Sequence, residues 1–229
     1  GDNTQATGDG STAMGYQTEA VGNFSTAIGF TTIASGDSSF AAGGNSVADG
    51  DNSISLGLNT SATGDVAVAL GVSTQASGNS STATGYQTTA SGPFSTAMGG
   101  ETTASGDNSI AMGKGTTASG IVAIATGINT EASGSYSTAM GSESIASGFA
   151  STAMGSGSSE ASGSRSTAIG TGNLASGTSS LAMGAGTTAS GSGSAALGTS
   201  GTASGDYSFV CNAGNVASGE NSTSIGYLT

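Results

Sequence analysis

Residues 90–99 read A-S-G-P-F-S-T-A-M-G, and residues 104–113 return to the same pattern as A-S-G-D-N-S-I-A-M-G. The first glycines of these stretches are 14 residues apart, and a glycine recurs at this spacing in 16 repeats along the chain. A single residue is inserted between Gly155 and Gly163, after which the spacing resumes. Because self-similarity at a fixed period is the signature of repeat architectures, this period decides the fold class.

Positions in a repeat are counted from its first glycine, so that Gly92 is position 0 and the second glycine, Gly99, is position +7. Alanine occupies −2 in all 16 repeats, serine occupies +3 in 14 repeats, and alanine occupies +5 in 13 repeats. A disordered chain of low complexity has no reason to keep such a register. We therefore expect one repeat solenoid over residues 1–229, forming a fragment of a longer chain.

The composition by itself indicates disorder, and it also limits the chemistry. Leu, Ile, Val and Phe make up about 14% of the chain and the formal net charge is −12, which is typical of disordered segments. The chain has no histidine, which excludes a Ser-His-Asp triad and histidine metal ligands. Two basic residues are too few to bind nucleic acid or anionic lipid. We expect no enzymatic activity and no cofactor.

The repeat predicts two short strands and two tight turns in each 14-residue coil of a parallel β-solenoid. Between the glycines, S-x-A-x-G alternates small and larger residues at period two, which is typical of a strand. Sixteen coils stacked at ~4.8 Å give a length of about 75 Å. Glycines at positions 0 and +7 are expected in the two turns, because glycine provides the positive φ or the close backbone approach that tight turns need. The predicted turn glycines include Gly8, Gly22, Gly36, Gly64, Gly92, Gly120 and Gly148.

The alternation also predicts which residues face the interior of the coil. Ser at +3, Ala at +5 and Gly at +7 share one face of the first strand, and with Ala at −2 they are expected to form a narrow interior. The opposite face carries position +6, where all six methionines of the chain occur. This +6 column contains Met14, Ile28, Leu56, Leu70, Met98, Met112, Met140, Met154, Ile169, Met183, Leu197 and Ile225.

A continuous column of large apolar side chains is not normally left in water. Two explanations remain open from the residues alone. Parallel copies of the chain could pack against each other along the column, which is the interpretation we favour. Alternatively, the large side chains could fill the coil interior while the alanines face outward.

The stretches at 90–99 and 104–113, together with A-V-G-N-F-S-T-A-I-G at 20–29, resemble the head repeat of YadA-like trimeric autotransporter adhesins. The match covers essentially the whole chain at the period of that family. The resemblance implies a left-handed parallel β-roll, a homotrimer about a common axis, an extracellular location on the cell surface, and adhesion to host or matrix molecules. A trimer agrees with the +6 column as an interface between chains.

Two polar columns are candidate binding surfaces. Acidic residues follow many first glycines, as at Asp37, Asp51 and Asp65, and stacked carboxylates could attract Ca²⁺. We favour the simpler explanation that Asp and Asn stabilise turns. Threonine recurs three residues after the second glycine, as at Thr18 and Thr88, and a flat threonine ladder raises an ice-binding hypothesis. We favour β-propensity and hydroxyl bonds between strands as the reason for this column.

Residues that depart from the repeat are the remaining candidates. Aromatic residues near the glycines, such as Phe24, Tyr136 and Tyr207, are interpreted as shields of coil edges, with anchoring of a partner as the alternative. Cys211 replaces methionine in the +6 column and is expected to act as a small apolar side chain, with contact between chains as the alternative. The irregular segments Ser158–Glu160 and Phe209–Asn212 are the best candidates for a partner site.

The function that best fits these observations is an extracellular adhesin head on the cell surface. Its expected partners are further copies of itself, as a homotrimer or fibre, and host or matrix surface molecules. A structural fibre or spacer is the alternative, with an ice-binding solenoid as a lesser variant. We expect no nucleic-acid partner and no direct membrane contact in this segment.

Overall fold

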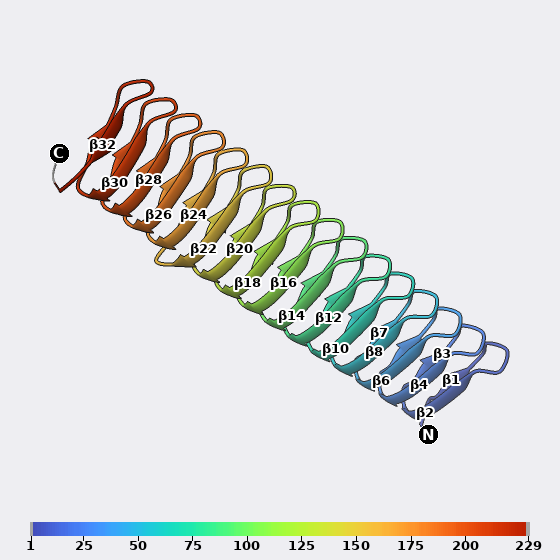
Figure 1. Ribbon diagram of the computed structural model, residues 1–229. Helices are drawn as coiled ribbons and strands as arrows, with labels where there is room; N and C mark the ends of the chain where they lie inside the picture. The colour runs from blue at the N-terminus through green and yellow to red at the C-terminus, as the bar shows by residue number, and fades with distance from the viewer. Residues whose placement is uncertain (1, 228–229) are drawn as a thin grey trace. The chain divides into compact units, whose positions relative to one another are not determined.

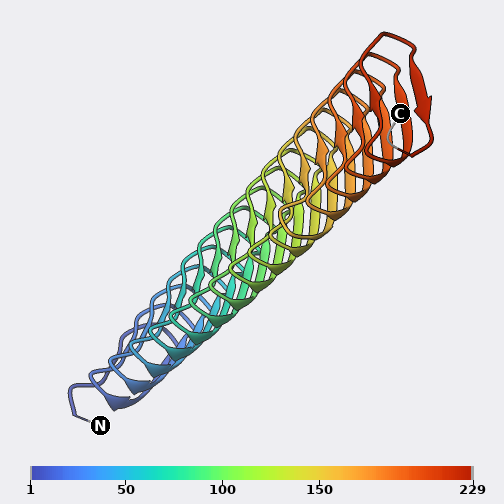
Figure 2. The ribbon, with the colours of Figure 1, turned by 90° about the vertical axis from the view of Figure 1, so that its left-hand side faces the viewer.

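The computed structural model describes residues 2–227 and is an all-β parallel solenoid of about 16 coils. It divides into two compact units, unit 1 from Gly1 to Gly115 and unit 2 from Thr116 to Thr229. Within each unit, every coil contributes one long and one short strand, and the coils stack one against the next (Figures 1 and 2). The predicted fold class is therefore confirmed.

The long strands begin at position +4 and most of them end at +8. In unit 1 they are β2 (Thr12–Tyr16), β4 (Thr26–Phe30), β6 (Phe40–Gly44), β8 (Ile54–Leu58), β10 (Val68–Val72), β12 (Thr82–Tyr86), β14 (Thr96–Gly100) and β16 (Ile110–Lys114). In unit 2 they are β18 (Ile124–Ile128), β20 (Thr138–Ser142), β22 (Thr152–Ser156), β24 (Thr167–Thr171), β26 (Leu181–Ala185), β28 (Ala195–Thr199), β30 (Phe209–Ala213) and β32 (Thr223–Ile225).

The short strands are two residues long and end at the invariant alanine of position −2. In unit 1 they are β1 (Gln5–Ala6), β3 (Glu19–Ala20), β5 (Ile33–Ala34), β7 (Val47–Ala48), β9 (Ser61–Ala62), β11 (Gln75–Ala76), β13 (Thr89–Ala90) and β15 (Thr103–Ala104). In unit 2 they are β17 (Thr117–Ala118), β19 (Glu131–Ala132), β21 (Ile145–Ala146), β23 (Glu160–Ala161), β25 (Leu174–Ala175), β27 (Thr188–Ala189), β29 (Thr202–Ala203) and β31 (Val216–Ala217).

Residues 2–227 contain no helix, and therefore no helical segment that could cross a lipid bilayer. Within each unit, long strands pair in parallel with long strands of neighbouring coils, and short strands pair with short strands. The register places each residue beside its counterpart in the next coil, as for Met98 and Met112. Each column of the sequence is therefore a column in space.

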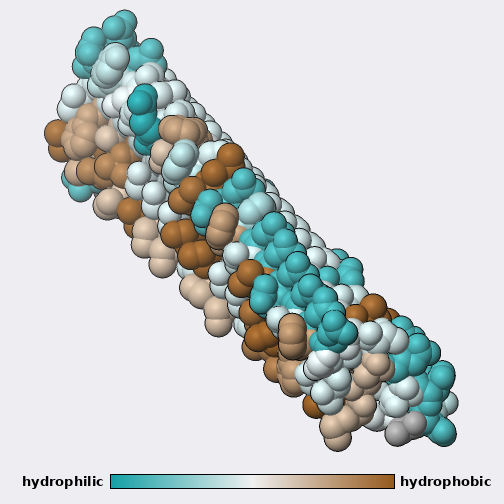
Figure 3. Space-filling view, turned by 90° about the vertical axis from the view of Figure 1, so that its right-hand side faces the viewer, coloured by the Kyte–Doolittle hydropathy of each residue, from teal (hydrophilic) through white to brown (hydrophobic). Residues whose placement is uncertain are grey.

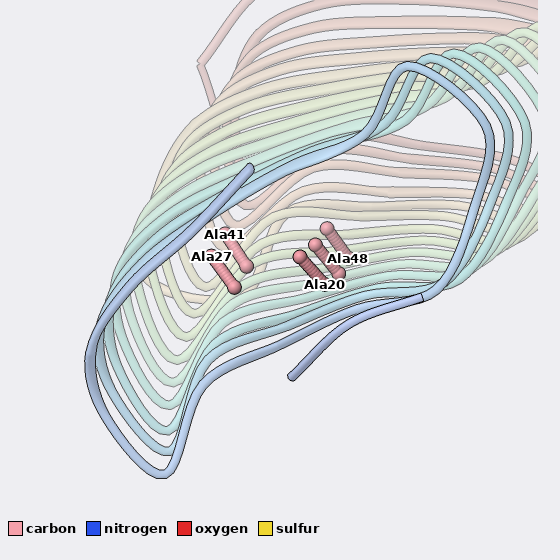
Figure 4. Packing of buried hydrophobic residues seen from close by; sticks show 5 residues of the cluster. Ala20, Ala27, Ala41 and Ala48 are labelled. Atoms are coloured by element: carbon pink, nitrogen blue, oxygen red, sulfur yellow. The ribbon is translucent and has the colours of Figure 1, made fainter. Parts of the chain in front are cut away.

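The interior of the coil is filled by small side chains, as the alternation predicts. Alanines at −2 and +5 are fully buried through most of both units, and so are serines at +3 and threonines at −4. In unit 1, Ala27 and Ala41 from the long strands point into the same interior as Ala20 and Ala48 from the short strands (Figure 4). Because these side chains bury little apolar area, the ladder of backbone hydrogen bonds carries much of the stability.

The first glycines lie at the start of a turn, and close backbone approach explains why they are glycine. A Cβ atom added to Gly8, Gly22, Gly36, Gly64, Gly92, Gly120 or Gly148 would lie 2.1–2.3 Å from the carbonyl oxygen of the first glycine in the next coil. That distance is far inside van der Waals contact. The positive φ of this turn belongs instead to position +2, as at Phe24 with φ 57° and Asn52 with φ 58°.

The second glycines do not form the second turn, which corrects the sequence-based expectation. They lie inside the long strands. Gly85, for example, has φ 126°, a backbone conformation that residues other than glycine rarely adopt. A Cβ atom there would lie 2.0 Å from the carbonyl oxygen of Gly99. The turn that follows places its positive φ at position +9, as at Thr31 with φ 51° and Asn45 with φ 53°.

The inserted residue lies in the connection between β22 and β23, where the chain forms a loop that projects beside its neighbours (Figure 1). Residues 156–158 are exposed, and Ser159 returns to the buried column of position −4. The pairing of β21 with β23 keeps Ala146 opposite Ala161. The insertion therefore leaves the columns on both sides in phase.

Candidate functional site

The outward face of the long strands carries the apolar +6 column. Position +5 points into the coil, and the pleat of a strand sends the next side chain to the other face. Ala97 is fully buried, for example, whereas the adjacent Met98 is 43% exposed. The large side chains therefore lie outside the coil, and the alternative in which they fill its interior is wrong.

Seven of the twelve large residues in the column are exposed and five are half-buried. The exposed residues are Met14, Ile28, Met98, Met112, Met140, Met183 and Ile225. The half-buried residues are Leu56, Leu70, Met154, Ile169 and Leu197. Partners in register cover part of each other, as for Leu56 and Leu70 or Met154 and Ile169, but no other part of the unit covers the column.

The surface around the column carries a single charged residue in the long strands, Lys114 at position +8 of β16, among the described residues. Position +4, two residues away on the same face, holds only threonine and apolar residues, among them Phe40, Ile54 and Leu181. No Asp, Glu, Lys or Arg occurs at +4 or +6 in any repeat. Figure 3 shows hydrophobic side chains exposed among hydrophilic ones on one face of the molecule. Such a surface suits contact with another apolar surface.

Cys211 belongs to this column and is a half-buried free thiol. It pairs in register with Leu197 on one side and Ile225 on the other. Its coil differs from the others inside as well, because Val210 replaces the +5 alanine. The opposing −4 position is Gly201, where a Cβ atom would lie 2.8 Å from Cγ1 of Val210. In this segment the larger Val210 at +5 is therefore matched by a smaller residue, Gly201, at −4, and the core volume is kept.

The threonine column at position −4 is buried, so it cannot offer a surface to ice. Thr18, Thr32, Thr88 and Thr102 are fully buried, as are the other threonines of this column in both units apart from Thr4 of the first coil, which is half-buried. Position −4 lies two residues before the inward alanine at −2, and side chains two apart in a strand share a face. The ice-binding hypothesis, which needed these hydroxyls on the surface, is wrong.

The acidic column at position +1 is part of the turn. In unit 1 the backbone N–H of Asn23 donates to Oδ1 of Asp37 at 2.8 Å, and that of Asp37 donates to Oδ1 of Asp51 at 2.9 Å. The backbone N–H of Asp9 donates likewise to Oδ1 of Asn23 at 3.1 Å. Asp and Asn therefore bind the preceding coil through the same oxygen, in line with the turn-stabilising interpretation. No cluster of metal-ligating side chains occurs within residues 2–227.

Aromatic residues at the turns cover neighbouring coils and remain exposed. The ring of Phe24 lies against Gly10, and that of Tyr207 lies against Gly193. A Cβ atom added to either glycine would lie 2.9 Å from Cδ1 of the facing ring, which is inside van der Waals contact. Tyr16 and Phe30 stack with ring centroids 5.3 Å apart at the ends of β2 and β4. Phe24 and Tyr207 still expose 71% and 65% of their surface. Shielding of coil edges is thus one part of their role.

One cluster was not recognised from the sequence. In unit 2, Ile121, Val122, Tyr136 and Phe149 place four exposed apolar side chains at the first turns of three successive coils. Tyr136 alone was considered as an anchor. The available signal was the replacement of Asp, Asn and Ser by large apolar residues at +1 and +2 of adjacent repeats. Arg165 follows at the next corner.

The stack of parallel 14-residue coils, with a small-residue core and an outward apolar column, defines a β-solenoid repeat protein. The family model described as YadA head domain repeat (2 copies) matches residues 6–32, 34–60, 62–88, 90–116, 118–144, 146–173, 161–187, 175–200 and 213–229. The chain therefore belongs to the YadA head repeat family. A search of curated proteins found no match to this chain.

Proposed function

We propose that this chain is the head of a trimeric, surface-exposed adhesin. Three parallel copies associate along the +6 column, and the surfaces that remain outside contact a host or matrix molecule. The observation that carries the proposal is the exposure of the +6 column in a molecule whose interior is already filled by small residues. Membership of the YadA head repeat family supports the same conclusion.

The regular spacing of the column supports a parallel arrangement. Neighbouring coils repeat at the strand spacing of ~4.8 Å, so two parallel copies present apolar residues at matching heights. Met98 and Met112 of one chain would then meet the same residues of the others. Homo-oligomers with closed cyclic symmetry use such matched surfaces, and a ring of three buries the column about its axis.

The mass of the protein in solution tests the association. Sedimentation equilibrium of the purified chain is expected to give three times the 21.2 kDa of one chain. Replacing Met98 and Met112 by lysine places charges in the column without touching the core. We expect this double variant to dissociate at concentrations at least about tenfold higher. For a trimer this is a hundredfold change in the dissociation constant, or about 2.8 kcal/mol.

Thr89→Lys with Thr103→Lys is the matched control, because these residues are paired neighbours on the outward face of the short strands. The control is expected to remain trimeric. A monomeric parent chain would contradict the proposal, and so would a double methionine variant that associates as tightly as the parent.

Adhesion is tested separately from association. Bacteria that display the head on a neutral anchor are expected to adhere to host cells or immobilised matrix proteins, whereas bacteria displaying the anchor alone are not. The second candidate is a plain spacer, favoured by the uniform interior and pairing from coil to coil. A trimeric head that confers no adhesion would support the spacer and contradict the adhesin.

A further inference from the structure

The first turns of unit 2 carry a group of exposed side chains in four successive coils. We name Ile121, Val122, Tyr136, Phe149 and Arg165 the corner patch. Its four apolar members expose 50%, 41%, 56% and 54% of their surface, in the order given. The two coils after Arg165 carry only serine, threonine or glycine at the same positions, as at Ser179 and Gly193, and Tyr207 further along is a single exposed ring.

Backbone contacts make the patch continuous from coil to coil. The backbone N–H of Tyr136 donates to the carbonyl oxygen of Ile121 at 2.7 Å, and that of Arg165 donates to the carbonyl oxygen of Phe149 at 2.7 Å. The rings of Tyr136 and Phe149 meet edge to face, with centroids 5.6 Å apart and planes at 72°. The patch is therefore one surface held on rigid turns.

Charge distinguishes this corner from the rest of a chain with a net charge of −12. From Ile121 to Gly193, positions +1 and +2 carry no Asp or Glu, whereas the same corner of unit 1 carries Asp37, Asp51 and Asp65. Arg165 is exposed and forms no ion pair with any side chain among residues 2–227. An unpaired cation beside apolar side chains is complementary to a carboxylate flanked by apolar groups.

We infer that the corner patch binds a polypeptide segment of a partner protein, one in which apolar side chains lie next to an Asp or Glu. Tyrosine and arginine dominate the binding energy of many protein interfaces, and exposed aliphatic residues extend the apolar contact. This inference rests on the adhesive role proposed above, for which it names the contact surface and the class of partner.

Selection from a phage-displayed library of random peptides tests the inference directly. The parent protein is expected to enrich peptides that combine aromatic or aliphatic residues with Asp or Glu. Synthetic copies of those peptides are expected to bind in fluorescence anisotropy, and replacement of their acidic residues by lysine is expected to weaken binding at least tenfold. Failure to enrich any peptide, or enrichment of basic ones, would overturn the inference.

Variants at the corner use residues that the same positions carry elsewhere, so that the turn is kept. Tyr136→Asn with Phe149→Ser is expected to weaken peptide binding at least tenfold. Arg165→Ser is expected to remove the preference for acidic over basic peptides. Phe94→Ser is the matched control, since Phe94 is 63% exposed at position +2 of unit 1. It is expected to bind peptides like the parent, and equal binding by all variants would contradict the inference.

Two other partners of the corner patch, a second copy of this chain and a glycan, would give different experimental results. If the corner patch joins copies of this chain, Tyr136→Asn with Phe149→Ser will lower the mass in sedimentation, and the inference is wrong. If the patch holds a glycan, binding to a glycan array will depend on Tyr136 and Phe149, with the same consequence. Peptide binding by a head that confers no adhesion would refute the proposed function while sustaining the patch as a binding site.

Discussion

At the scale of single residues, the second glycine of each repeat meets two separate constraints. Gly85 has φ 126°, and the site of its absent Cβ is 2.0 Å from the carbonyl oxygen of Gly99. Either constraint alone disfavours any other residue, and the neighbouring strand cannot retreat because it is bonded to the next coil in turn. Asn212 shows how the column tolerates a different residue, with its φ reduced to 80°.

Gly85→Ala is therefore expected to destabilise the protein by about 2–4 kcal/mol, through backbone strain and displacement of the next strand. Thermal unfolding followed by circular dichroism would measure the loss. Gly100→Ala is the matched control, because Gly100 has no atom within 4 Å of its Cβ site. The control should leave the melting temperature nearly unchanged, and an equal loss in both variants would refute the steric explanation.

At the scale of elements, the two strand types of a coil are tied together by a few buried side chains. Asn173, at position −4 in unit 2, donates through Nδ2 to the carbonyl oxygens of Ile169 at 2.7 Å and Gly184 at 2.8 Å. Its Oδ1 accepts from the backbone N–H of Thr187 at 2.9 Å and from the hydroxyl of Thr187 at 2.8 Å. This amide links β24 and β26 to the start of β27.

Asn173→Ala is expected to destabilise the protein by about 2–4 kcal/mol, because four hydrogen bonds are lost and buried groups stay unpaired. Thr88→Ala provides the comparison: Thr88 is equally buried at the same position, and its hydroxyl has no partner among the described residues. Urea titration would measure both changes. A loss at Thr88 as large as that at Asn173 would show that volume, rather than hydrogen bonding, governs the column.

The strands and their faces can be predicted from the sequence, because alternate residues of a strand share a face and only the face with small residues fits inside a 14-residue coil. Ala97 inside and Met98 outside could be predicted from small and large residues at adjacent positions. The burial of Thr88 could also have been predicted, since Ala90 two residues later was already assigned to the interior. The favoured explanation of this column, β-propensity with hydroxyl bonds between strands, does not by itself assign the threonines to a face, and the alternation needed to do so was applied only to other columns of the repeat.

The place of the second glycine could not be predicted in this way. Glycine at a fixed spacing is compatible with a turn or with a strand that approaches its neighbour closely, and the sequence does not separate these possibilities. The corner patch needed the structure for another reason. Tyr136 and Phe149 occupy different positions in their repeats, +2 and +1. They therefore belong to different columns of the repeat, and only the three-dimensional structure shows that their rings are in contact.

At the scale of the whole molecule, stability is distributed among neighbouring coils. Within each unit, every long strand pairs only with the long strands before and after it, and the short strands do the same. A solenoid of this kind gains stability from interfaces between adjacent repeats, and each repeat can be exchanged for another with the same residues in register. The tolerated insertion between Gly155 and Gly163 fits this, because it changes a loop and preserves the pairing.

Removal of residues 78–91 from unit 1 deletes one complete coil and joins Ser77 to Gly92, so every column stays in phase. We expect this variant to fold with an unchanged β-sheet spectrum per residue and a melting temperature within a few degrees of the parent. Removal of residues 78–84 deletes half as many residues. It takes away the turn and the first three residues of β12 (Thr82–Tyr86) and keeps the second half of that coil, so β10 and β14 no longer have a complete strand between them. Because a displaced strand loses both its register and its buried face, this shorter deletion should abolish cooperative unfolding. Equal tolerance of the two deletions would show that the 14-residue coil is not the unit of stability.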